Sequence, residues 1–381
     1  METFPLTYLV ALSSPGDCVA AIFSLRGDSL PTLKSKLTMK IKRRLAALSI
    51  VLFLTSTPLQ GQLTLDEGAT ISFASAVEGK AVLTSRDDFV KRMSPFDRAA
   101  RLKTNKDVSE RQYLEFVSQN VLEWSDSEKG KINSVLKGIE KNLAALALPL
   151  PDQVFLIKTT GKEEGGAAYT RGNAVVLPQA KLKTAVVGIQ MTICHELFHI
   201  ISREHPDLRE KFYAAIGFAR CHEVEFPQAL KSKKITNPDA PRNNHCIRVK
   251  VSGNDQWAIP ILFSDTEKYD TDRGGEFFDS LQFQLLLVER PDDGLVVSAM
   301  MEGPKPKLVA IQEVSGFFEQ VGRNTGYIIH PEEILADNFA LWVMRQGELP
   351  SPQIIEKMKV ILETWKATGK AAAAGADQTR R

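Results

Sequence analysis

Apolar residues recur at helical spacing along much of the chain, and several of these stretches carry residues that typically begin or end a helix. Glu128 follows Ser125 by three positions, which is the spacing of a capping box. Pro206 ends one helix because the residue before a proline avoids helical geometry, and Pro331 suits the first turn of another. The pattern predicts helices over 86–97, 108–123, 126–146, 182–204, 206–217, 331–346 and 352–366.

Shorter apolar runs predict strands between these helices. Residues 62–84 have an extended, mixed pattern. The runs 154–158 and 167–177 precede the helix over 182–204, with an irregularity at Arg171-Gly172-Asn173. Four further strands fall in a turn-rich stretch, at 246–251, 257–263, 283–289 and 295–300, with a hairpin turn at 291–294. Together the elements predict an α+β fold: a mainly helical N-terminal part, a small sheet, and a β-rich insertion over 218–325.

A cationic segment followed by an apolar one near the N-terminus is typical of a secretory signal peptide. Basic residues precede the apolar run 45–54, and small and polar residues lead to a cleavage point after Gly61. The run is shorter than the roughly 20 residues that span a bilayer. We expect 1–38 to be an over-extended start and 39–61, beginning at Met39, to export the protein to the periplasm or outside the cell. The alternative is a genuine leader with a buried helix at 45–57.

The composition is that of a globular protein, with 43% hydrophobic and 25% charged residues. A formal net charge of +2 gives no basic footprint for nucleic acid. We expect the mature chain to form one domain over 62–366 without stable membrane insertion, followed by a disordered tail at 367–381. Four cysteines are too few for a disulfide scaffold, although Cys221 and Cys246 could pair in an oxidising compartment.

The predicted helix over 182–204 contains His195-Glu-Leu-Phe-His199, an HExxH motif. Four positions make slightly more than one helical turn, so both imidazoles project from one face and can bind one zinc ion. Glu196 lies beside them, placed to act on a water molecule at the metal. Uncharged residues flank the motif on both sides, whereas a surface pair of histidines with an incidental glutamate would have polar flanks.

A catalytic zinc site normally has a third protein ligand. Downstream of the motif, two ExxxD sequences offer one. Glu289–Asp293 encloses Pro291 and runs into a turn, whereas Glu333-Ile-Leu-Ala-Asp337 lies in a predicted helix, where i and i+4 share a face. We therefore predict Glu333 as the third ligand and Asp337 as the partner that orients His195. The alternative is that these acidic groups only complement the positive end of their helix.

The two motifs, HELFH and EEILAD, resemble those of the gluzincin metallopeptidases, whose thermolysin-like and CAAX-type endopeptidase members have HExxH and a distant ExxxD or ExxAD. The resemblance covers well under a tenth of the chain. It implies a zincin-like catalytic domain with His195, His199 and Glu333 as zinc ligands and Glu196 as general base. It also implies a cleft-lining strand before the zinc helix, which would be 167–177 unless that is an ordinary interior strand.

Two further residues could stabilise the oxyanion, because Tyr327 and His330 directly precede the predicted ligand helix. Either could instead pack against that helix or cap it. His222 and His245 adjoin Cys221 and Cys246, and a second metal site from these four would have weak spacing. The turn-rich segment 236–245 could form a loop facing the cleft, and it suggests no chemical role.

These features predict an exported, zinc-dependent peptidase that hydrolyses peptide bonds of a protein or peptide substrate. A zinc-binding recognition module without activity is the first alternative, and the intact Glu196 argues against it. The second alternative is a zinc hydrolase of another bond, such as a cell-wall amide.

Overall fold

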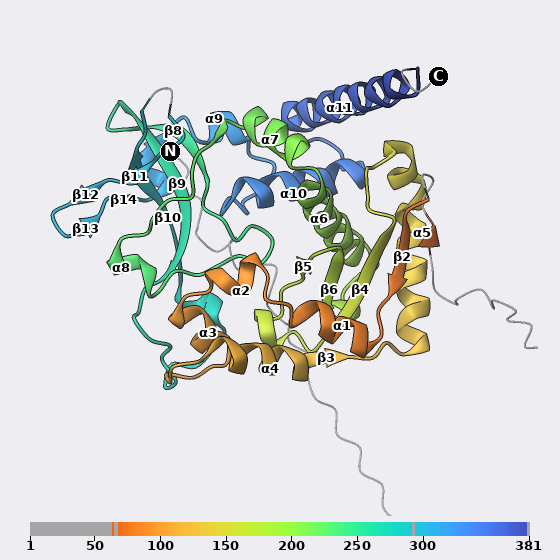
Figure 1. Ribbon diagram of the computed structural model, residues 1–381, viewed down its shortest axis with the longest axis horizontal. Coiled ribbons are helices and arrows are strands. Elements are labelled where there is room, and N and C mark those ends of the chain that lie inside the picture. Colours follow the sequence, from red (N-terminus) through yellow and green to blue (C-terminus); the bar gives the residue numbers. More distant parts are fainter. Residues whose placement is uncertain (1–62, 65–67, 292–293, 379–381) are drawn as a thin grey trace, which may run out of the picture.

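The computed structural model describes residues 63–64, 68–291 and 294–378. The predicted signal peptide, the over-extended start and part of the predicted turn at 291–294 lie outside these residues. The described chain mixes helices with sheets, as the predicted α+β class requires. Figure 1 shows two sheets on opposite sides of the molecule, with helices α6 (Val186–Glu204) and α10 (Pro331–Val343) between them.

The first sheet has the strand order β1-β2-β4-β6-β5, and β3 also pairs with β4. Its strands are β1 (Leu63–Thr64), β2 (Thr70–Phe73), β3 (Val121–Leu122), β4 (Gln153–Thr159), β5 (Tyr169–Arg171) and β6 (Ala174–Pro178). β2, β4 and β6 are parallel to one another, whereas β5 turns back antiparallel to β6. β5 therefore forms one edge of this sheet.

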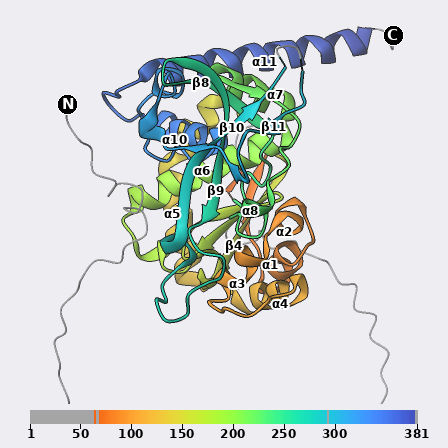
Figure 2. The same ribbon diagram turned by 90° about the vertical axis from the view of Figure 1, so that its left-hand side faces the viewer.

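Helices pack against both faces of the first sheet. Successive side chains of a strand point to opposite faces, so each strand contributes residues to two separate cores. Leu156 and Val175 join the main core with α6 and α5 (Asp126–Leu146). Ile157 and Val176 face the other way, into a smaller core made by the N-terminal helices. Those helices are α1 (Ala76–Leu83), α2 (Asp88–Arg92), α3 (Pro95–Arg101) and α4 (Glu110–Asn120), and they lie together in the lower half of the molecule in Figures 1 and 2.

The second sheet occupies the region predicted as a β-rich insertion, in the order β11-β10-β9-β8-β15, with β7 on β8 and β14 on β10. Its long strands are β8 (His245–Val251), β9 (Asn254–Ser264) and β10 (Leu281–Glu289). The short strands of this region are β7 (Phe218–Arg220), β11 (Ser298–Ala299), β14 (Leu308–Val309) and β15 (Val314–Ser315), with β12 (Met301–Glu302) and β13 (Lys305–Pro306) as a separate hairpin.

One core connects the two sheets through the central helices. Ile193 and Leu197 of α6 are buried with Leu335 and Phe339 of α10 and with Leu285 of β10. The remaining helices are α7 (Pro206–Ala215), α8 (Gln228–Lys231), α9 (Phe318–Val321) and α11 (Pro352–Gln378). In the described part of the chain, no helix combines the length and apolar character needed to cross a membrane.

Several predicted elements differ from those observed. The helix predicted over 86–97 is two helices, because Ser94 caps a new one whose first residue is Pro95. The stretch predicted as extended contains α1, which begins with a capping box of Ser75 and Glu78. The strand predicted over 167–177 is the hairpin β5–β6, turned at Gly172 with φ +55°.

The C-terminal predictions also need correction. α11 continues to Gln378, through residues predicted to be a disordered tail. The run Ala371-Ala-Ala-Ala374 explains the difference, because alanine has the highest helix propensity. The helix predicted over 331–346 ends at Val343, and the strand predicted over 295–300 is reduced to Ser298–Ala299.

Candidate metal centre

The HExxH motif lies on one buried face of α6, where His195 and His199 point in the same direction. Their ring centroids are 4.7 Å apart. α6 begins with the exposed residues Val186 and Val187 and is mostly buried from Ile193 to Ser202. A buried helix of this kind fixes the direction of both imidazoles because neighbouring side chains restrict their rotamers.

α10 crosses this face of α6 and brings Glu333 to both histidines. Glu333 Oε2 lies 3.0 Å from His195 Nε2 and 3.6 Å from His199 Nε2. One ligand atom from each of the three residues lies within 4.8 Å of the others. The structure thus brings together the three residues that the sequence analysis predicted as ligands. Two imidazoles and one carboxylate form the donor set of many catalytic zinc sites.

Each histidine also contacts a carboxylate through its other ring nitrogen. His195 Nδ1 lies 2.8 Å from Asp337 Oδ1, the partner that the sequence analysis predicted. His199 Nδ1 lies 3.0 Å from Glu332 Oε1. Because a carboxylate accepts hydrogen bonds, each Nδ1 can donate its proton to its own carboxylate, and the two Nε2 atoms, which both face Glu333 Oε2, are the nitrogens placed to bind a metal.

Glu332 is a contact that the sequence analysis missed. Its other oxygen accepts hydrogen bonds from the hydroxyls of Ser202 and Tyr213, so the carboxylate is fully satisfied although it is buried. Glu332 lies about 100° from Glu333 around the helix, so helical spacing alone does not place both on the same face. α6 packs so closely against α10 that this neighbouring face contacts His199.

The residues present fit a bound cation. His199 Nε2 is buried and has no hydrogen-bond partner among the described residues, and neither has Glu196 Oε2. Burial lowers the pKa of His195, but its hydrogen bonds to Asp337 and Glu333 raise it to about 10. The pKa of His199 is likewise raised, against burial, by the charges of Asp239 and Glu333. A group of carboxylates this dense favours positive charge, which a metal ion can supply in place of protons.

Glu196 lies in the same cluster without contacting the imidazole nitrogens. Burial, followed by the charge of Asp239, raises its pKa to about 8. A carboxyl group with a raised pKa is suited to accept a proton and return it near neutral pH.

The loop 236–245, for which the sequence suggested no role, reaches the site. Asn237 Nδ2 donates a hydrogen bond of 2.6 Å to Glu333 Oε1. Asp239 forms a second potential ligand group with Glu196 and His199, again within 4.8 Å. Turn-rich residues carry no periodic pattern, so the sequence offered no signal that would place Asp239 there.

The two residues proposed to stabilise an oxyanion have different environments. The ring of Tyr327 lies 6.2 Å from that of His195, and the negative charges of Glu333 and Asp239 help burial to raise the pKa of its hydroxyl, which stays protonated. His330 instead caps α10, where its Nδ1 accepts a hydrogen bond from the Glu332 amide. Burial and neighbouring His245 lower its pKa to about 4. His330 therefore has the capping role that the sequence analysis gave as the alternative to oxyanion stabilisation.

The cysteines differ from the predicted pairing. Cys194, Cys221 and Cys246 are all free and buried. Interaction with the neighbouring Cys221 thiol, followed by the charge of Arg290, lowers the pKa of Cys246 to about 7. Arg290 Nη1 also donates to Cys246 Sγ at 3.1 Å. His245 bonds Glu210 at 2.9 Å and not a metal group. The predicted disulfide is therefore absent from the described structure.

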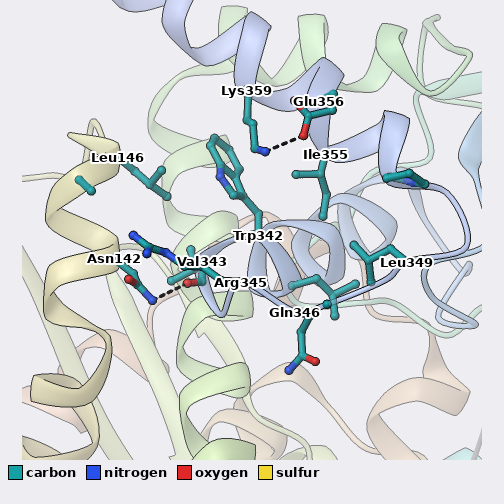
Figure 3. Close-up of a pocket in the computed structure, with 14 residues that line it drawn as sticks. Asn142, Leu146, Trp342, Val343, Arg345, Gln346, Leu349, Ile355, Glu356 and Lys359 are labelled. Carbon is teal, nitrogen blue, oxygen red and sulfur yellow. Dashed lines mark hydrogen bonds and ion pairs between the residues drawn. The ribbon is translucent and has the colours of Figure 1, made fainter.

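A cavity of about 440 Å³ lies away from this cluster, between α5, the end of α10 and the start of α11 (Figure 3). Trp342 and Leu146 line it, and Asn142 Nδ2 bonds the Val343 carbonyl at its edge. Trp342 follows Glu333 by nine residues, which is about 13 Å along the helix. The cavity belongs to the opposite end of α10 and contributes nothing to the metal cluster.

Comparison with protein-family models, curated proteins and solved structures finds no match to this chain.

Proposed function

We propose that this protein is a zinc-dependent peptidase with His195, His199 and Glu333 as metal ligands and Glu196 as general base. One observation carries the proposal. Three ligand atoms converge beside a buried carboxylate whose Oε2 has no partner among the described residues. A purely structural zinc site is normally closed by four ligands and has no need of such a group.

The contacts of each residue indicate its role in the proposed reaction. When bound, zinc supplies Lewis acidity toward a carbonyl oxygen and lowers the pKa of nearby water. Glu196 accepts the proton of the attacking water and delivers it to the leaving amine. Asp337 and Glu332 hold the two imidazoles in the tautomer that leaves Nε2 free. Tyr327 beside His195 donates a hydrogen bond to the developing oxyanion.

A peptide substrate suits the edge of the first sheet. β5 ends the strand order, and Thr170 on this strand is close enough to the site to contact Asp239. An extended peptide can add to such an edge through main-chain hydrogen bonds. The zincin-like domain and the gluzincin relationship belong to this proposal, as does export through the signal pattern at 39–61.

The test is hydrolysis of casein and of a peptide library by the purified protein. We expect cleavage that 1,10-phenanthroline abolishes and added zinc restores. Glu196→Gln should bind zinc but not cleave, and Glu204→Gln, an exposed substitution on the same helix, should behave as wild type. Stoichiometric zinc without cleavage of any peptide would contradict the proposal and favour a binding module, or hydrolysis of another bond such as a cell-wall amide.

A further inference from the structure

Asn237 contacts the third predicted ligand from outside the helix that carries it. Its side-chain nitrogen Nδ2 donates a hydrogen bond of 2.6 Å to Glu333 Oε1. The other oxygen of the same carboxylate, Oε2, lies 3.0 Å from His195 Nε2 and 3.6 Å from His199 Nε2. The two oxygens of Glu333 thus have different partners, since Oε2 faces the imidazoles and Oε1 faces Asn237.

The separations around Glu333 Oε2 suit one metal ion. Zinc binds imidazole nitrogen and carboxylate oxygen at about 2.0 to 2.2 Å, and tetrahedral angles then place two ligand atoms about 3.4 Å apart. The observed distances of 3.0 and 3.6 Å from Oε2 to the two Nε2 atoms bracket this value. Oε2 can therefore bind the ion alone, whereas a carboxylate that binds through both oxygens would have to turn Oε1 away from Asn237.

The side chain of Asn237 is fixed through both of its polar atoms. Its Oδ1 accepts a hydrogen bond of 3.0 Å from the Asp239 amide, in a local turn that is common for asparagine. Because a backbone amide only donates, the atom that it contacts must be the oxygen, so the nitrogen faces Glu333. Asp239 is itself held by β5, since its Oδ1 accepts a hydrogen bond of 2.7 Å from the Thr170 amide.

The chain before Asn237 is anchored by buried charges of α3. The Thr236 amide donates to Asp97 Oδ2 at 2.9 Å, and Arg101 Nη2 donates to the Thr236 carbonyl at 3.2 Å. Asp97 and Arg101 are buried and form an ion pair with each other. Charge-assisted hydrogen bonds of this kind are among the stronger ones in proteins. The position of Asn237 is therefore set by α3 and β5, independently of α10 and Glu333.

We propose that Asn237 is a positioning residue that holds Glu333 as a monodentate ligand and so keeps a coordination position of the metal open beside Glu196. The amide occupies Oε1 and prevents this oxygen from binding the ion. Two histidines and a bidentate glutamate would supply four ligand atoms, whereas a catalytic zinc site keeps one position for water or substrate. This inference rests on the proposed metal site, but it concerns ligation and can be tested without any substrate.

The first test uses the full chain loaded with Co²⁺, whose visible spectrum reports ligation, and sodium azide as a probe for an open coordination position. Asn237→Ser keeps a hydroxyl that can accept from the Asp239 amide but is too short to reach Glu333. Asn237→Asp keeps the shape and the turn but loses the donor. Asn243→Ser is the matched control, because Asn243 lies in the same loop and donates to the Pro260 carbonyl on β9 at 3.2 Å.

We expect azide to cause a saturable spectral shift in the wild type and in Asn243→Ser. Both Asn237 variants should bind azide more weakly by roughly tenfold or more, which is the scale on which lost partners of metal ligands act. A purely structural role of Asn237 would lower the melting temperature and leave the azide affinity of the bound ion unchanged. Equal azide affinity in the wild type and Asn237→Ser would therefore overturn the inference, as would a wild type that binds Co²⁺ without responding to azide.

Peptide hydrolysis by the zinc forms is then measured separately, and Asn237→Ser should lower kcat with little change in KM. If azide distinguishes the variants as expected but no protein cleaves any peptide, the proposed function fails and the positioning role stands. If the wild type cleaves peptides and Asn237→Ser binds azide as the wild type does, the positioning role fails and the proposed function stands. Failure of the wild type to bind Co²⁺ would overturn both.

Discussion

The Nδ1 atom of His199 lies 3.0 Å from Glu332 Oε1, and both side chains are almost completely buried. This contact mirrors the one between His195 and Asp337 on the other imidazole. Each ring is therefore oriented by a carboxylate from α10, and adjacent turns of a single helix supply both partners along with Glu333. α10 does more than supply one predicted ligand, since its carboxylates also orient both imidazoles.

Glu332→Gln should lower zinc affinity by about 10- to 100-fold, because the loss of such a partner leaves the imidazole less basic and less well oriented. Glu332→Ala should also reduce stability by about 1 to 3 kcal/mol, since the Ser202 and Tyr213 hydroxyls lose their acceptor. Competition titration with a zinc chelator measures the first effect and urea unfolding the second. Unchanged zinc affinity in Glu332→Gln would contradict the role of Glu332 in orienting His199.

Asp337→Ala should weaken zinc binding by a similar factor through His195, again about 10- to 100-fold. Asp337 also accepts a hydrogen bond from Thr325, so Thr325→Val is a useful companion. Thr325→Val removes one hydrogen bond to the Asp337 carboxylate but keeps the carboxylate itself. It should therefore reduce zinc affinity less than Asp337→Ala does. The same titration ranks the two variants, and a larger loss in Thr325→Val would contradict this order.

Glu196→Gln should reduce peptide turnover by about a hundred- to ten-thousandfold, which is the usual contribution of a general base. Zinc content should stay the same, because the three ligands remain in place. Steady-state kinetics together with metal analysis of the same sample provide the measurement. Near-wild-type turnover would assign proton transfer to another group.

The sequence was sufficient to predict the two helices of the site and three residues that meet there. HExxH and ExxxD depend on local helical spacing, so His195, His199 and Glu333 could be identified without a structure. Glu332 could not, because its partner depends on how closely α6 and α10 pack. Asp239 comes from a loop without periodicity, 43 residues after Glu196 in the chain, and only tertiary structure brings it beside Glu196.

The fold shows the same limit. Helices with strong caps, such as α5 after Ser125, have the predicted bounds. The order of strands in each sheet could not be predicted, because pairing joins segments far apart in the chain. The sequence contains the capping box of Ser75 and Glu78, but the mixed pattern of polar and apolar residues around it predicts an extended segment.

Lys234 offers a prediction about stability that does not involve the metal. Burial lowers its pKa from 10.5 to about 8. Between these pH values the unfolded chain binds more protons than the folded one, so the free energy of unfolding rises with pH across that interval. Lys234→Met should remove this rise and stabilise the protein near pH 7 by on the order of 1 to 3 kcal/mol. Urea unfolding of both proteins at pH 7 and pH 10 tests it, and parallel pH dependence would contradict it.

The central claim is that His195, His199 and Glu333 hold one zinc ion, and the most direct test is the zinc content and affinity of Glu333→Ala. Glu289→Ala is the matched control, because Glu289 is exposed on β10 and belongs to the other ExxxD sequence. We predict one tightly bound zinc per chain in the wild type and in Glu289→Ala, and a sharp loss of affinity in Glu333→Ala. Stoichiometric, tightly bound zinc in Glu333→Ala, or none in the wild type, would contradict the account.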